Sequence, residues 1–104
     1  MDIQFNTDNN VEGKQALETY MSEFIAESLD RFSSQITRIE VHVSDENGNK
    51  KGPKDKRCLL EARLKGMEPI AVTSQEDSIK KAVNEAVGKM RATLTTRMGK
   101  LKTH

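Results

Sequence analysis

The segment at residues 45–58, DENGNKKGPKDKRC, gathers acids, amides, glycines and bases with almost no apolar residue. Such a run is typical of a calcium loop, a phosphate-binding loop or a basic contact for nucleic acid. A calcium loop takes oxygen ligands from its first, third and fifth positions, which here hold Asp45, Asn47 and Asn49. It also requires glycine sixth and glutamate twelfth. Lys50 and Lys56 stand there instead, so the segment is not a calcium site.

A phosphate-binding loop fits no better. It needs four residues between its glycines, and Lys-Ser or Lys-Thr after the second glycine. Three residues separate Gly48 from Gly52, and Pro53-Lys54 follows. We therefore interpret the segment as a connection between two strands, with turns at Asn-Gly and Gly-Pro.

The bases of this connection leave two interpretations open. They could be solvated charges that discourage aggregation at exposed strand edges. They could also form a flexible basic finger that contacts phosphates and releases counterions. The bases of such a finger are Lys50, Lys51, Lys54, Lys56 and Arg57, offset by Asp55.

No catalytic constellation accompanies this segment. Nucleophilic catalysis needs a nucleophile, a base and a group that orients the base. The histidines are His42, in the middle of an alternating stretch, and His104, the last residue. Cys58 alternates in phase with Leu60, which predicts a small core residue, and one cysteine with two distant histidines makes no zinc cluster. We predict no enzyme, no metal, no cofactor and no small-molecule substrate.

Charge is distributed unevenly over the 104 residues, although the net charge is only +1. Residues 1–46 hold three Lys/Arg against ten Asp/Glu, whereas residues 47–104 hold fourteen against six. This asymmetry favours an anionic partner for the C-terminal half, or attraction between the two halves of the fold. No apolar run is long enough to span a membrane, no secretory signal is recognisable, and one cysteine suits a reducing compartment. We expect a single cytoplasmic domain over residues 1–104.

The apolar pattern predicts the elements that must position these charges. Residues 2–6 alternate as a short strand. From about residue 14, apolar residues recur every three or four positions, which predicts a helix with an acidic outer side. Its apolar stripe consists of Leu17, Met21, Phe24, Ile25, Leu29 and Phe32.

Alternation returns in residues 37–44 and 57–64, and a last short strand is expected at 70–73. Residues 74–78 offer helix caps with acids in the first turn, and a second helix follows with an apolar stripe from Ile79 to Leu94. The order β-α-β-β-β-α predicts an α+β two-layer sandwich, with both helices on one face of a four-stranded sheet. The other face should be open to solvent and carry Arg38, Glu40, His42, Arg57, Glu61 and Arg63.

Beyond these patterns, the chain resembles the ribosome hibernation-promoting factor family, also called the ribosome-associated inhibitor or sigma-54 modulation protein family. The resemblance rests on the order of the elements, on ALETYMSEFIAESLDRF running into ITRIEVHVSDENG, and on KAVNEAVGKM. It covers almost the whole chain. The sequence DENG followed by DKRC resembles a feature of the family's short, single-domain branch. We expect neither the C-terminal dimerisation domain of the long relatives nor an extended inhibitory tail.

The resemblance implies a bacterial, cytoplasmic protein with a fold like the double-stranded-RNA-binding domain. It implies binding to the small ribosomal subunit and its ribosomal RNA near the decoding centre. Such binding inhibits translation and promotes ribosome hibernation under stress, without catalysis. The family's second-helix lysine falls on Lys89, and the arginine late in its first helix falls on Arg31. Local charge alone suggests RNA contacts from Lys80, Lys81 and Arg91.

A protein-interaction module is the alternative. The open sheet face or an exposed edge strand would then bind a protein partner, with no role for RNA. Salt separates the two hypotheses, because contacts to phosphates weaken steeply as salt rises and apolar contacts do not. The sequence leaves open the oligomeric state and whether ribosomes are paired or only silenced.

Overall fold

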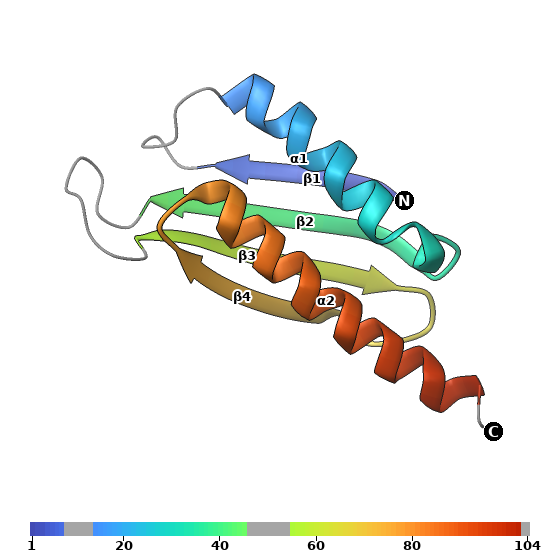
Figure 1. Ribbon diagram of the computed structural model, residues 1–104. Helices are drawn as coiled ribbons and strands as arrows, with labels where there is room; N and C mark the ends of the chain where they lie inside the picture. Colours follow the sequence, from blue (N-terminus) through green and yellow to red (C-terminus); the bar gives the residue numbers. More distant parts are fainter. Residues whose placement is uncertain (8–13, 46–54, 103–104) are drawn as a thin grey trace.

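The computed structural model describes residues 1–7, 14–45 and 55–102 of the chain (Figure 1). Its elements are β1 (Asp2–Thr7), α1 (Lys14–Ser28), the short 3-10 helix η1 (Asp30–Phe32), β2 (Ile36–Asp45), β3 (Lys56–Leu64), β4 (Ile70–Glu76) and α2 (Ile79–Lys102). Within these residues, the four strands form one sheet in the order β1-β2-β3-β4. β1 runs parallel to β2, and the other neighbours are antiparallel.

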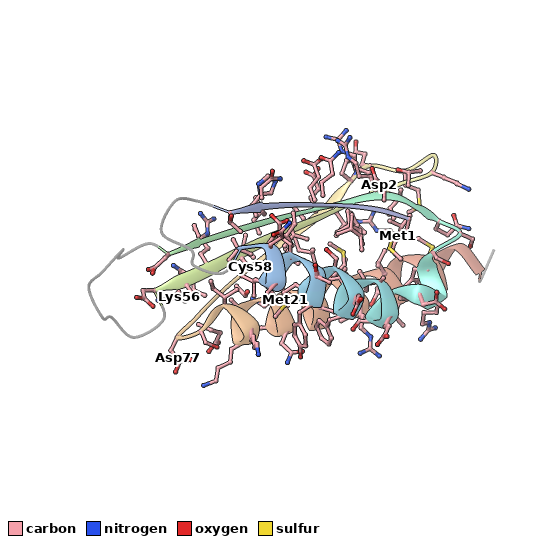
Figure 2. The ribbon with its side chains drawn as sticks, turned by 90° about the horizontal axis from the view of Figure 1, so that it is seen from above. Met1, Asp2, Met21, Lys56, Cys58 and Asp77 are labelled. Atoms are coloured by element: carbon pink, nitrogen blue, oxygen red, sulfur yellow. The ribbon has the colours of Figure 1, made fainter. Side chains whose placement is uncertain are left out.

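Both helices cover the same face of the sheet, and the core lies between the two layers (Figure 2). Alternate residues of the central strands point into it, among them Val41 of β2 and Leu60 of β3. Met21 of α1 and Leu94 of α2 meet them from the helical side, and all four side chains are at most 2 % exposed. Full burial of an aliphatic side chain contributes about 1.5–3 kcal/mol, so the facing stripes hold the layers together. The predicted α+β two-layer sandwich is confirmed.

The first helix differs from its prediction at the C-terminal end. A continuous helix to Phe32 was expected, but α1 ends at Ser28 and the tighter η1 follows. The amide of Phe32 donates to the carbonyl of Leu29 at 3.0 Å, as a three-residue turn requires. This change of pitch keeps Leu29 and Phe32 in the core, at 0 % and 4 % exposure. The prediction was right about the buried stripe and wrong about a single helix.

The boundary between β4 and α2 also differs. β4 continues through Ser74 to Glu76, so the expectation that residues 74–76 belong to the helix start was wrong. Pairing with β3 places them in the sheet, because Ser74 lies opposite Cys58 and Glu76 opposite Lys56. Ser78 does cap α2, since its hydroxyl oxygen accepts a hydrogen bond from the Lys81 amide at 3.2 Å. α2 then runs beyond the predicted stripe to Lys102.

Cys58 is fully buried on the core face of β3, as predicted. Burial raises the pKa of its thiol to about 12, against an ordinary value of 9.0. Only the thiolate reacts with thiol reagents.

We therefore expect native protein at pH 8 to be labelled at Cys58 no faster than it unfolds. Labelling in strong denaturant should be rapid, because the unfolded thiol regains an ordinary pKa. The measurement is the labelling rate in buffer and in urea; rapid labelling in buffer would contradict the burial. Because the folded pKa is the higher one, this thiol also lowers stability as pH rises above about 9.

Candidate nucleic-acid interface

The second helix is fixed to the edge strand at its first turn. The hydroxyl of the buried Ser74 in β4 donates a hydrogen bond to the main-chain carbonyl of Ala82. Ala82, Val83, Ala86 and Val87 then face the core. Lys80, Lys81, Lys89 and Arg91 lie on the other sides of the helix and are exposed.

Two of these lysines lie near carboxylates, and one lies over a ring. Lys81 Nζ is 3.1 Å from an oxygen of Asp77, and Lys89 Nζ is 3.4 Å from one of Glu85. Lys80 Nζ lies 5.0 Å from the centroid of the exposed Tyr20 ring of α1. Exposed ion pairs of this kind contribute roughly 0–1 kcal/mol, so the lysines can exchange these partners for phosphates at small cost.

Lys89 also reaches the edge of the sheet. Its Nζ donates to the main-chain carbonyl of Thr73 at 2.7 Å, while its side chain stays 50 % exposed. β4 is the last strand of the sheet. A strand in that position presents unpaired carbonyl and amide groups at its outer side. Lys89 thus covers one of these groups and places a positive charge beside the edge.

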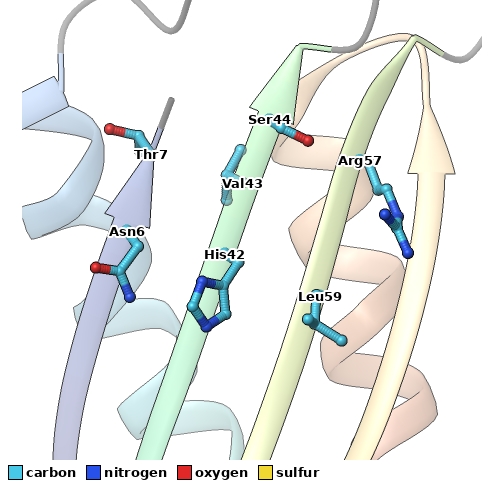
Figure 3. A pocket seen from close by; sticks show the side chains of 7 residues that line it. All are labelled: Asn6, Thr7, His42, Val43, Ser44, Arg57 and Leu59. Carbon is cyan, nitrogen blue, oxygen red and sulfur yellow. The ribbon is translucent and has the colours of Figure 1, made fainter. Parts of the chain in front are cut away.

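A second cation comes to the same edge from the sheet. Arg57 is exposed on β3, on the face away from the helices, and lies opposite Gln75 in the β3–β4 register. Figure 3 shows its guanidinium extending from β3 toward the neighbouring strand.

Arg57 and Lys89 together line a polar depression with a volume of about 350 Å³, which we call the edge notch. Its other residues are Thr73, Ser74 and Gln75.

The edge notch has the chemistry of a phosphate contact. A guanidinium offers several N–H donors in a planar fork, and an ammonium offers a compact point charge. The two groups come from different elements, β3 and α2, which are both anchored in the core. Their positions are therefore set by the fold and not by one flexible segment.

Not all of the predicted cations belong to this notch. Arg31 lies 4.9 Å over the ring of Phe32 and lines a separate depression with Gln35 and Met98. Figure 1 places the end of α1 at the opposite end of the sheet from the end of β4. The structure therefore does not bring Arg31 together with Lys89.

Lys56 was expected in a flexible finger, but it is the first residue of β3. Its Nζ lies 2.9 Å from Asp55 and 3.4 Å from Asp45. The hydrogen bond to Asp55 raises the pKa of Lys56, so its charge is held within the protein. Lys50, Lys51 and Lys54 of the same predicted finger lie outside the described residues.

The open sheet face carries the charged residues that the alternation predicted. Glu40 is central, because Arg38 and Arg63 lie 2.8 and 3.3 Å from its carboxylate and His42 lies 3.8 Å away. The hydrogen bond from Arg38 is the main reason why the pKa of Glu40 is lowered. Arg63 also contacts Glu61 at 3.3 Å. The two acids and two arginines among them, Glu40, Glu61, Arg38 and Arg63, therefore neutralise one another on this part of the face.

Sequence reasoning missed Thr73, Ser74 and Gln75 as site residues. Their side chains carry no charge, and the polar run Ser74–Glu76 was interpreted as part of a helix start. The signal that could have found Gln75 is the hairpin register, because a tight β3–β4 turn places it opposite Arg57.

Within residues 1–7, 14–45 and 55–102, no group of three His, Cys, Asp or Glu side chains is placed to hold a metal ion. No helix in the same ranges has the length and apolar character needed to cross a membrane.

Comparison with known proteins gives one family and several similar folds. The sequence model described as "Sigma 54 modulation protein / S30EA ribosomal protein" matches residues 3–102. No curated protein sequence gives a significant match.

Two solved structures illustrate the similarity of the fold. The Protein Y N-terminal domain of Thermus thermophilus is 21 % identical, with a TM-score of 0.74 over 92 % of this chain and 98 % of that one. A ribosomal subunit interface protein from Coxiella burnetii is 20 % identical, with a TM-score of 0.72 over 95 % and 99 % of the two chains.

Proposed function

The chain belongs to the sigma 54 modulation protein / S30EA ribosomal protein family, and we propose that it is a ribosome-associated factor that silences idle ribosomes. It binds the small ribosomal subunit through ribosomal RNA near the decoding centre. Occupation of that site excludes messenger and transfer RNA, so translation stops and the ribosome is kept in reserve under stress. This action requires occlusion and no chemical step.

One observation carries the proposal beyond family membership: Arg57 and Lys89 converge on the edge notch from two elements. Ribosomal RNA presents a dense array of phosphates, and neutralising them releases condensed counterions. The exposed Lys80, Lys81 and Arg91 extend this positive surface along α2.

The opposite charges on the outer sides of the two helices indicate which side of the protein faces the RNA. Glu23, Glu27 and Asp30 are exposed on α1 and η1, and their charge opposes approach of phosphates from that side. The β4 edge and the outer side of α2 therefore face the RNA, and the acidic side of α1 faces away.

Co-sedimentation with purified ribosomal subunits across a salt series tests this proposal. We expect the chain to move with the small subunit at low salt. If it neutralises about three phosphates, raising the salt from 50 to 200 mM should weaken binding by about 20- to 40-fold, since log K falls by ≈0.7–0.9 per phosphate for each unit of log salt.

Two results would contradict the proposal. A chain that stays at the top of the gradient at low salt does not associate with ribosomes. Ribosome binding that is insensitive to salt would instead favour the alternative, a protein-interaction module that uses the open sheet face.

A further inference from the structure

The open sheet face is ordered in rows across the strands, because the register places particular residues side by side. Asn6, His42, Leu59 and Thr73 form one such row, each opposite the next on the neighbouring strand. The adjoining row contains Ser44, Arg57 and Gln75. All of these side chains lie on the face that the helices leave uncovered, since their neighbours in sequence point into the core.

These two rows differ from the rest of the face. The acids Glu40 and Glu61 lie in the preceding row and are bound by Arg38 and Arg63, as described above. The rows of His42 and Arg57 contain no carboxylate among the described residues. They offer instead amides, hydroxyls, one imidazole, one apolar side chain and one guanidinium.

Five of the residues in these rows line a shallow depression of about 270 Å³, which we call the face depression (Figure 3). Its residues are Asn6, Thr7, His42, Val43, Ser44, Arg57 and Leu59. Arg57 also lines the edge notch, so the two depressions adjoin at this residue.

We propose that the face depression binds one unpaired nucleobase of RNA while a neighbouring phosphate of the same strand occupies the edge notch. The proposal rests on the proposed function and deepens it, because it specifies single-stranded RNA as the bound form. Phosphate recognition by Arg57 and Lys89 alone would accept a duplex equally well.

The residues of the face depression match the chemistry of a nucleobase. His42 is 45 % exposed and offers a flat ring for stacking, and Leu59 next to it offers an apolar surface. Bases in single-stranded RNA stack on aromatic rings, histidine included. The amide of Asn6 and the hydroxyl of Ser44 flank His42 and can both donate and accept hydrogen bonds at a base edge.

Other ligand classes fit less well. An isolated anion would meet one guanidinium here, whereas the edge notch offers two cations. An apolar ligand would leave the amide and hydroxyl groups without partners, which is costly where water is excluded. A base inside a duplex cannot lie flat on a sheet, because both of its faces are already stacked.

Equilibrium binding of the full chain to a short single-stranded oligoribonucleotide tests the proposal. The same strand with abasic ribose in place of its central nucleotides keeps every phosphate and removes the bases. We expect the abasic strand to bind about five- to tenfold more weakly, in line with the loss of one stacked base. His42→Ala should weaken binding of the intact strand by a similar factor, and His42→Phe should restore it.

Gln4→Ala is the matched control, since Gln4 is exposed on the same face but does not line the depression. It should leave binding unchanged, and circular dichroism should show that all three variants fold. Equal binding of intact and abasic strands, or no effect of His42→Ala, would overturn the nucleobase site. Either result would leave the proposed function standing if the chain still moves with the small subunit; loss of that association would instead overturn the proposed function.

Discussion

Simultaneous replacement of Arg57 and Lys89 by glutamate is expected to weaken ribosome binding by about a hundredfold or more. Each charge-assisted hydrogen bond to a phosphate contributes about 1.5–3 kcal/mol, and the acidic replacements also repel the RNA. Both side chains are exposed, and Lys89 donates to the main-chain carbonyl of Thr73 at the sheet edge. The fold should therefore survive the change. The measurement is the dissociation constant for small subunits at fixed low salt.

Two controls separate the edge notch from net charge. Lys65→Glu reverses an exposed lysine in the β3–β4 turn, away from the notch, and should weaken binding by less than about threefold through the long-range field alone. Glu23→Lys on the exposed side of α1 should not weaken binding. If Lys65→Glu weakens ribosome binding as much as Arg57→Glu does, the edge notch is not the contact.

Reversing the charges of Lys80 and Lys81 should weaken ribosome binding less than reversing the charge of Lys89, because neither residue lines the notch.

The largest expected effect on stability comes from Leu60→Ala. Leu60 is fully buried on the central strand β3, between Val41 of β2 and Val72 of β4. Removing its side-chain atoms leaves a cavity in the core between the sheet and the helical layer, which lowers the free energy of unfolding by about 2–5 kcal/mol. For a domain of this size, the melting temperature should fall by about 10 °C or more.

The control for this prediction is the neighbouring residue. Leu59→Ala removes the same atoms from the open face of the same strand, where Leu59 is only partly buried. We expect Leu59→Ala to lower the free energy of unfolding by less than about 1 kcal/mol. Urea denaturation of both variants under the same conditions measures the difference. Similar losses at both positions would mean that the two faces of β3 are not buried as the structure places them.

The layers and faces of the fold could be predicted because they depend on local periodicity. Alternation in residues 37–44 and 57–64 assigned Val41 and Leu60 to the core and His42 and Leu59 to the open face, and the structure confirms each assignment. The errors lie where long-range pairing decides. Ser74–Glu76 has the polar composition of a helix start, yet hydrogen bonds to the opposite strand of the hairpin make it part of β4.

The two cations of the edge notch were predictable one at a time, but the notch that they form was not. Charge and family resemblance pointed to Arg57 and Lys89 separately, since they are 32 positions apart. Their convergence depends on how α2 packs against β4, and no sequence pattern encodes the contact from Lys89 to a main-chain carbonyl. Lys56 illustrates the opposite case, because its charge suggested a partner outside the chain while the fold places it beside Asp45 and Asp55.

Site-specific crosslinking to the ribosome can show whether the edge notch is the side of the protein that contacts ribosomal RNA. The chain has one native cysteine, and the buried, protonated Cys58 should remain unmodified, so an introduced surface cysteine can carry a photo-crosslinker alone. We expect Gln75→Cys, at the edge notch, to crosslink to RNA of the small subunit, and Glu23→Cys, on the acidic side of α1, not to crosslink. Crosslinks to that RNA from Glu23→Cys but not from Gln75→Cys would contradict this expectation.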